Sequence, residues 1–172
     1  IFVMLTMAGE SANRICQVLP EASTITNPEN PDYVVENGDI EYKNVSFKYA
    51  LRAEKNALDS ISIKIKSGST VGIIGGTGSS KSTFIQLIPR LYDVTEGSLK
   101  VGGIDVREYG VEALRNEVAV VLQKNILFSG TIKEHLRWGD PNATDEELKK
   151  ACELAQADEF IQKFPDKYDT HI

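Results

Sequence analysis

A run of small residues followed by a lysine, in the middle of the chain, has the composition needed to bind a polyphosphate. The run comprises Gly75, Gly76, Thr77, Gly78, Ser79, Ser80, Lys81 and Ser82. It nearly fits the pattern G-x-x-x-x-G-K-[ST], in which small residues let successive backbone N–H groups point inward around phosphate oxygens. A helix that begins directly after such a loop adds the positive end of its dipole. The spacing therefore predicts that Lys81 reaches the β- and γ-phosphates and that the Ser82 hydroxyl binds Mg²⁺.

Ser80 departs from this pattern, because it stands where the last glycine is expected. A Cβ atom at this position crowds the loop if the backbone there requires a positive φ. A serine at the start of a helix is otherwise sterically ordinary, and its hydroxyl adds a hydrogen-bond donor. We expect the loop to bind phosphate. The alternative is a glycine- and serine-rich turn that binds nothing.

The segments around the loop predict the elements that position it. Residues 70–74 (TVGII) indicate a short buried strand before the loop, and residues 80–90 indicate a helix after it. Residues 118–122 (VAVVL) are apolar throughout, which is typical of a parallel strand covered on both faces. A strand, a glycine-rich loop and a helix in this order form a phosphate-binding unit. The central part of the chain therefore predicts an α/β fold with a parallel core.

A further group of elements is predicted from hydrophobic periodicity alone. The strands are expected at residues 40–49, 61–65 and 97–101, and the helices at 111–116, 131–137 and 144–157. The alternation in the first strand slips near Asn44, and the first two strands are expected to pair. Thr144 and Glu147 have the spacing of a capping box, which fixes the start of the last helix. These strands predict an antiparallel part beside the parallel core.

The composition of the chain limits the classes of function. With 172 residues, of which 41% are hydrophobic and 26% charged, the chain has the make-up of one globular domain. A formal net charge of −6 argues against nucleic acid as a partner, because nucleic-acid surfaces attract basic patches. Cys16 and Cys152 lack the spacing of a metal site or a disulfide framework. No apolar run approaches the roughly eighteen residues that a membrane helix needs.

The amino-terminal part differs in composition from the rest. Residues 1–20 have apolar positions at loose helical spacing, and Pro20 is expected to end that helix. Residues 21–39 hold two prolines and several acids with little periodicity, which predicts an extended linker. The compact domain is expected to span residues 40–172. Since the first residue is Ile1 rather than methionine, we expect the chain to be a piece of a longer protein.

Taken together, the order of these pieces resembles the ATPase domain of ABC-type exporters over nearly the whole chain. Residues 45–49 (VSFKY) are similar to the aromatic loop of that family, which implies that Tyr49 stacks on adenine; the alternative is a strand-end aromatic in the core. Residues 72–83 resemble the family's Walker A segment, in which Thr83 adds a hydroxyl near the α-phosphate. The resemblance implies ATP and Mg²⁺ as cofactors.

Two later segments extend the resemblance. Residues 118–123 are similar to the strand that ends in the family's Q-loop, which implies that Gln123 approaches Mg²⁺ and the attacking water. Residues 127–132 (LFSGTI) and 136–139 (LRWG) resemble the exporter segment downstream of that glutamine, and this stretch is the most specific for exporters. Residues 1–20 resemble the cytoplasmic tail of the last membrane helix; the alternative is a free-standing amphipathic helix.

The resemblance implies a parent protein at the cytoplasmic face of the plasma membrane that couples ATP hydrolysis to export. Its partners would be the membrane domain of the same chain and a second ATP-binding domain, in a homodimer or a heterodimer that encloses two ATP molecules. The expected fold class is an α/β P-loop ATPase core with an antiparallel β subdomain, incomplete at the carboxyl terminus.

Two other functions stay open at this point. The family's signature motif, Walker B glutamate and switch histidine are expected beyond residue 172, so we expect the chain alone to be inactive as an ATPase. A non-catalytic or degenerate nucleotide-binding half-site is therefore one alternative. The other is a different P-loop enzyme such as a small-molecule kinase, against which Tyr49, Gln123 and residues 127–132 argue.

Overall fold

The computed structural model describes residues 2–50, 52–124 and 126–172, so Ile1, the first residue of the predicted amino-terminal helix, lies outside the described residues. The chain divides into two compact units, Ile1–Ala119 and Val120–Ile172. The first unit holds the antiparallel sheet and the phosphate loop. The second unit is helical.

The sheet of the first unit has four strands in the order β2-β1-β3-β4, and each neighbouring pair is antiparallel. The strands are β1 (Ile40–Phe47), β2 (Leu58–Ile65), β3 (Glu96–Val101) and β4 (Ile104–Asp105). The three strands predicted from alternation are therefore confirmed, and β4 is an addition. β4 was not predicted because two residues are too few to show a period.

The predicted slip in the first strand is also confirmed. The pairing of β1 with β2 shifts between Tyr42 and Val45, and Asn44 at this point has a φ of 48°. The Asn44 N–H donates to the Ser62 hydroxyl over 2.9 Å, so the bulge keeps a hydrogen bond that the regular ladder would have supplied. The shift turns Val45 and Phe47 toward the buried side, where they join Tyr42.

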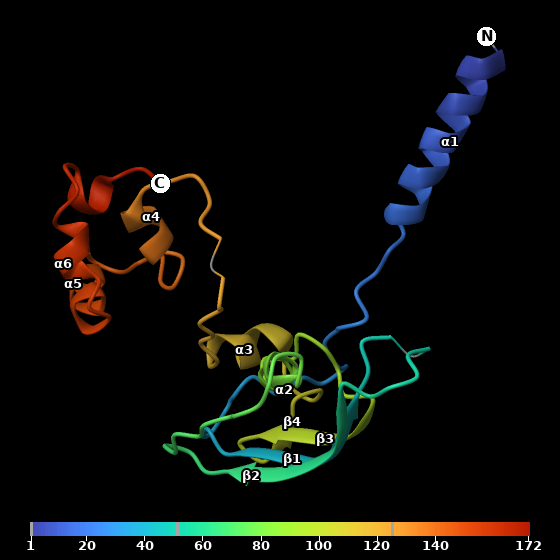
Figure 1. Cartoon of the computed structure of the whole chain (residues 1–172), viewed down its shortest axis with the longest axis horizontal. Coiled ribbons are helices and arrows are strands. Elements are labelled where there is room, and N and C mark those ends of the chain that lie inside the picture. Colours follow the sequence, from blue (N-terminus) through green and yellow to red (C-terminus); the bar gives the residue numbers. More distant parts are fainter. Residues whose placement is uncertain (1, 51, 125) are drawn as a thin grey trace. The chain divides into compact units, whose positions relative to one another are not determined.

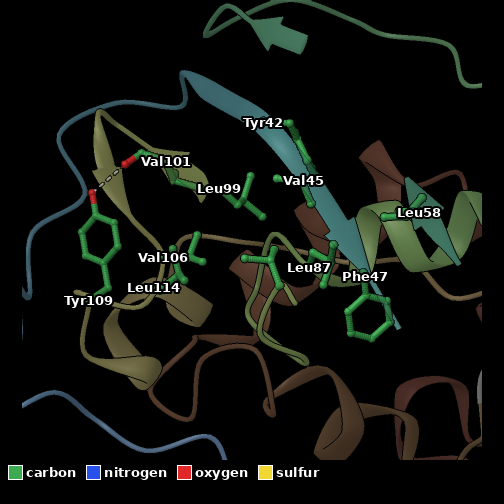
Figure 2. Packing of buried hydrophobic residues seen from close by; sticks show 11 residues of the cluster. Tyr42, Val45, Phe47, Leu58, Leu87, Leu99, Val101, Val106, Tyr109 and Leu114 are labelled. Atoms are coloured by element: carbon green, nitrogen blue, oxygen red, sulfur yellow. Dashed lines mark hydrogen bonds between the residues drawn. The ribbon is translucent and has the colours of Figure 1, made fainter. Parts of the chain in front are cut away.

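Helices α2 (Lys81–Gln86) and α3 (Val111–Asn116) lie over one face of the sheet, and the core of the unit fills the space between (Figure 1). Leu87 after α2 and Leu114 of α3 are fully buried together with Leu99 of β3 (Figure 2). At one edge of this core the Tyr109 hydroxyl donates to the Val101 carbonyl over 2.8 Å. The core thus fixes the helix that follows the phosphate loop against the sheet.

The helix after the loop is shorter than predicted, and two predicted strands are wrong. Helix α2 ends at Gln86 rather than near residue 90, where Pro89 cannot donate a helical hydrogen bond and Arg90 has a φ of 52°. Residues 70–74 and 118–122 form no strand, and their side chains are largely exposed. An apolar run indicates that its side chains can be buried, but it does not identify a strand to pair with. A parallel strand needs a neighbouring strand to form hydrogen bonds with its backbone groups. In the described residues, no strand is paired with either segment.

The amino-terminal helix is confirmed as α1 (Phe2–Val18), and Met4, Met7, Ile15 and Val18 on it are exposed. None of the helices in the described residues is both long and apolar enough to span a membrane. Residues 21–39 contain no helix or strand, as expected of an extended segment. This segment is nevertheless bonded to the domain, because Asp32 pairs through its backbone with Tyr109.

The second unit contains α4 (Ile132–Leu136), α5 (Asp145–Leu154), α6 (Asp158–Ile161) and a short 3-10 helix, η1 (Lys167–Asp169). The predicted capping box of α5 is confirmed, since the Thr144 side chain accepts from Glu147 N–H while Glu147 reaches back to the backbone of Thr144. Helix α5 ends at Leu154, three residues before the predicted end. Helices α4 and α5 are joined by Asp145, which accepts from Lys133 at 2.7 Å and from Arg137 at 2.6 Å.

Candidate functional site

The candidate site is built on the loop that leads into α2. Thr77 and Gly78 form its turn, and Gly78 has a φ of 82°, a conformation that a side chain disfavours. Gly75 approaches the far side of the loop so closely that a Cβ would lie 2.6 Å from the Ser79 hydroxyl oxygen. Gly78 thus lets the backbone curve tightly, which is what a phosphate-binding loop requires, whereas a Cβ at Gly75 would meet only side-chain atoms.

Lys81 closes the loop. Its ammonium donates to the carbonyl oxygens of Gly75 at 2.7 Å and Gly76 at 2.8 Å, and to the Ser79 hydroxyl at 3.1 Å. These contacts keep a positive charge within the curve of the loop, in a chain whose net charge is −6. The ammonium can exchange these neutral acceptors for phosphate oxygens, because the negative charge of a phosphate attracts it more strongly than a carbonyl dipole does. That Lys81 reaches the β- and γ-phosphates stays a prediction.

Ser80 adopts the conformation that the loop pattern reserves for glycine. Its φ is 61° and its ψ is 24°, in the left-handed region, and it occupies the position that precedes α2. The Ser80 side chain makes no capping hydrogen bond to the helix. The expectation that a serine here is sterically ordinary is therefore wrong. A glycine would adopt this conformation without the cost that a Cβ brings.

Ser82 and Thr83 begin α2 and differ in their surroundings. Ser82 is exposed, whereas Thr83 is buried, and its hydroxyl oxygen lies 2.7 Å from the hydroxyl of Tyr49. This hydrogen bond joins the end of β1 to the start of the helix, across 34 positions in the sequence. The structure thus brings together two residues that were predicted separately, Tyr49 for the base and Thr83 for the α-phosphate.

Tyr49 belongs to an aromatic cluster, which we define as Phe47, Tyr49 and Tyr92. The Tyr49 ring meets Phe47 edge to face at a centroid distance of 4.9 Å and Tyr92 at 5.2 Å. Tyr49 still exposes 57% of its surface, so it is not the core aromatic that the alternative interpretation required. Tyr92 was not predicted as part of the site. The sequence offers only its aromatic type as a signal.

Tyr42 is a second residue that the sequence did not reveal as part of the site. It stacks on Phe84 of α2 with ring centroids 4.2 Å apart, and its hydroxyl donates to the Phe84 carbonyl over 2.7 Å. Burial raises the pKa of the Tyr42 hydroxyl well above its ordinary value, so the group stays protonated and donates. Tyr42 therefore holds α2, and with it Lys81 and Ser82, against the sheet.

Gln123, the predicted ligand of Mg²⁺, lies in the second unit and is exposed. Its role toward the metal and the attacking water stays a prediction. Within residues 2–50, 52–124 and 126–172 there is no group of three or more His, Cys, Asp or Glu side chains placed to hold a metal ion. A hydroxyl such as that of Ser82 is thus the kind of protein ligand that this loop offers to a hard cation.

The chain is similar to known proteins over almost its whole length. The model of the family described as "ABC transporter" matches residues 58–172. YgaD of Bacillus subtilis, which bears the name of a multidrug export ATP-binding/permease protein, is 41% identical over 98% of this chain and 29% of its own length. The human ATP-binding cassette sub-family B member 5 is 38% identical over 99% of this chain and 14% of its own length.

A solved structure shows the same fold. The structure of a bacterial Atm1-family ABC exporter with ATP bound matches 99% of this chain and 30% of its own length, with a TM-score of 0.86 and 27% identity. The P-loop α/β class with an antiparallel β part is therefore confirmed. The chain spans less than a third of the length of each of these proteins.

Proposed function

This chain belongs to the ABC transporter family, and we propose that it is the ATP-binding part of an exporter subunit that couples ATP binding and hydrolysis to export across a membrane. The observation that carries the proposal is the position of Lys81, whose ammonium is held within 3.1 Å of three oxygens of a tightly curved loop at the start of α2. Such a loop suits the phosphates of a nucleotide.

We assign each part of the nucleotide to a part of the site. The phosphate-binding residues are Gly75, Gly76, Thr77, Gly78, Ser79, Ser80, Lys81, Ser82 and Thr83. Lys81 binds the β- and γ-phosphates, and Thr83 is placed toward the α-phosphate through its position at the start of α2. Tyr49 stacks on the adenine ring, and its exposed fraction of 57% leaves surface for that contact. The hydrogen bond between Tyr49 and Thr83 keeps the base-binding and phosphate-binding parts at a fixed separation.

Mg²⁺ fits the donor set of the loop. The Ser82 side chain is exposed on the first turn of α2, next to the lysine that binds the terminal phosphates, and hydroxyl oxygens suit a hard cation. We propose Ser82 and Gln123 as its protein ligands. Bound there, the ion would neutralise charge on the phosphate oxygens during transfer. Gln123 would orient the attacking water.

The parts outside the loop suggest partners for the domain. The exporter relatives are named as combined ATP-binding and permease proteins, which supports a membrane domain in the same parent chain. We propose that residues 1–20 are the cytoplasmic tail of its last membrane helix, that residues 21–39 are the linker, and that residues 40–172 are the front part of the ATP-binding domain. The site would then lie at the cytoplasmic face of the plasma membrane, opposite a second ATP-binding domain.

The alternatives are less well supported. The family match and the exporter relatives argue against a small-molecule kinase. The strained backbone of Ser80 is one argument for a degenerate half-site. A functional site and a degenerate one differ in a measurable way, because a functional site should bind ATP in a manner that depends on Lys81.

The test is a calorimetric titration of the chain with MgATP. Lys81→Ala should weaken binding by about 2 kcal/mol or more, since it leaves desolvated phosphate charge without its partner. Lys150→Ala removes an exposed lysine of the second unit and should leave the affinity unchanged. Equal affinities for the wild-type chain and Lys81→Ala would refute the assignment of the loop.

A further inference from the structure

A small pocket next to Tyr49 has one wall formed by the segment that follows α1. It has a volume of about 200 Å³ and is lined by Thr24 and Ile25 together with the aromatic cluster of Phe47, Tyr49 and Tyr92. Thr24 and Ile25 come from the segment that follows α1. Ile25 is half-buried, whereas the other residues from 21 to 27 are exposed. Ile25 is thus the one side chain of residues 21–27 that is half-buried, and it lines the pocket together with the cluster.

The same segment is fastened to the domain beyond the pocket. The Asn27 side-chain oxygen accepts from Val111 N–H over 2.9 Å at the start of α3. The Asp32 N–H donates to the Glu108 carbonyl over 2.9 Å, and the Asp32 carbonyl accepts from Gly110 N–H over 2.8 Å. We call residues 24–32 the strap. Its position is set at one end by these hydrogen bonds and at the other end by Ile25.

On the amino-terminal side the strap leads to α1 after a short distance. Helix α1 ends at Val18, seven positions before Ile25. Between these two residues the backbone makes two hydrogen bonds back to the helix end, from Leu19 N–H to the Ile15 carbonyl and from Glu21 N–H to the Val18 carbonyl. Ile25 is the first half-buried side chain after α1, and it lines the same pocket as Tyr49.

We propose that Ile25 is a positioning residue for the nucleotide base and that a base on Tyr49 orders the strap. The inference rests on the proposed function, because it assumes that Tyr49 binds adenine. A base stacked on Tyr49 restricts the aromatic cluster and with it the pocket that Ile25 lines. Linkage is reciprocal: if a bound base stabilises the ordered strap by a given factor, a strap held in place by Ile25 must strengthen binding of the base by the same factor. The occupancy of the base site is thereby coupled to the segment that leads to α1.

Hydrogen–deuterium exchange measured by mass spectrometry on the full chain tests the coupling. MgATP and magnesium tripolyphosphate both occupy the phosphate loop, but tripolyphosphate carries no base. We expect both ligands to slow exchange in residues 75–82, and only MgATP to slow exchange in residues 22–27. Protection of the loop by MgATP without protection of the strap would overturn the coupling and leave the proposed function intact. If neither ligand protected the loop, the proposed function itself would fail.

Two matched variants test the role of Ile25. Ile25→Ala should weaken MgATP binding about fivefold, as expected for the loss of a half-buried aliphatic contact, and should leave tripolyphosphate binding unchanged. Val34→Ala changes a side chain that is 65% exposed and lies outside the strap, so its affinities should match those of the wild-type chain. Tyr49→Ala should abolish the protection of residues 22–27 by MgATP. Unchanged MgATP affinity in Ile25→Ala, or equal losses for both ligands, would show that Ile25 does not position the base.

Discussion

Ser80 is the residue at which this phosphate loop differs from its pattern in a way that has an energetic cost. A side chain in the left-handed conformation costs about 1–2 kcal/mol, because Cβ approaches the following carbonyl oxygen. A glycine removes that cost. The greater conformational freedom of glycine in the unfolded chain lowers the free energy of unfolding by about 0.4–1 kcal/mol and so offsets part of the gain. We therefore expect Ser80→Gly to raise the free energy of unfolding by about 0.5–1 kcal/mol, measured by urea denaturation.

Two further substitutions at this position separate backbone strain from the hydroxyl. Ser80→Ala keeps the Cβ and should leave stability close to that of the wild-type chain, since the hydroxyl makes no capping bond. Ser80→Val adds a β-branch and should be the least stable of the series, because branched residues are outliers at positive φ. A loss in Ser80→Ala as large as that in Ser80→Val would mean that the hydroxyl, rather than φ, decides the stability of the loop.

The tightly curved loop could be predicted from the sequence, because its chemistry is local. The spacing of Gly75, Gly78 and Lys81 indicated one short loop that ends in a lysine, and the ammonium donates to two carbonyl oxygens of that loop. Its binding to phosphates stays a prediction. The contact between Tyr49 and Thr83 could not be predicted, because it depends on how β1 and α2 pack. The sequence left two conformations open for Ser80, an ordinary helix start and a positive φ, and the structure has the positive φ.

At the scale of secondary structure, the start of α5 depends on one short contact pattern. The Thr144 side chain accepts from the backbone N–H of Glu147, and the Glu147 carboxylate accepts from the backbone N–H of Thr144. Two backbone N–H groups that would otherwise be unpaired are therefore satisfied. These hydrogen bonds lower the pKa of Glu147 below its ordinary value, the backbone hydrogen bond from Thr144 contributing most. Thr144→Ala should therefore lower the free energy of unfolding of the second unit by about 1 kcal/mol.

Chemical denaturation followed by far-UV circular dichroism checks this prediction, with Asn142→Ala as the control at a neighbouring exposed position. The pH dependence provides a second check. Because the folded-state pKa of Glu147 is lowered, its contribution is present above the unfolded-state value and is lost as the pH falls through the folded-state value. Thr144→Ala keeps the backbone donor at this position but loses the hydrogen bond from the hydroxyl to the Glu147 carboxylate, so the part of the difference that comes from this bond should be lost in acid. A difference that stayed constant down to low pH would show that the bond between the hydroxyl and the carboxylate contributes nothing to it.

Helices and strands could be predicted where a single segment contains both the hydrophobic period of the element and the residues that mark its start or end. The alternation in β1 and β2 and the capping residues at the start of α5 are local, and these elements form, although α5 ends three residues before its predicted end. Residues 70–74 and 118–122 were wrongly predicted as strands because their apolar composition indicates burial without naming a partner. A strand needs a neighbouring backbone, and that information is not contained in either run.

At the scale of the whole molecule, the same two apolar runs bear on whether copies of the chain associate in solution. Ile74 is 99% exposed and Val121 is 92% exposed, and both lie in short apolar segments whose backbone is not part of a sheet. Exposed apolar segments with unpaired backbone groups are sites at which chains associate through strand pairing. We expect the 172-residue chain to associate as its concentration rises, which sedimentation velocity can measure.

Charged substitutions in these runs identify the surface responsible. A lysine opposes strand-to-strand association through charge repulsion and desolvation, so Val121→Lys and Ile74→Lys should each shift the distribution toward monomer, and the double variant should shift it further. Val34→Lys introduces the same charge at a residue that is 65% exposed but lies outside both runs, and it should associate like the wild-type chain. Circular dichroism of each variant shows whether the fold is kept. If Val34→Lys dispersed the chain as well as Val121→Lys does, the two apolar runs would not be the surface responsible. Each lysine brings the net charge of −6 closer to zero by the same amount, and that change alone favours association rather than dispersal.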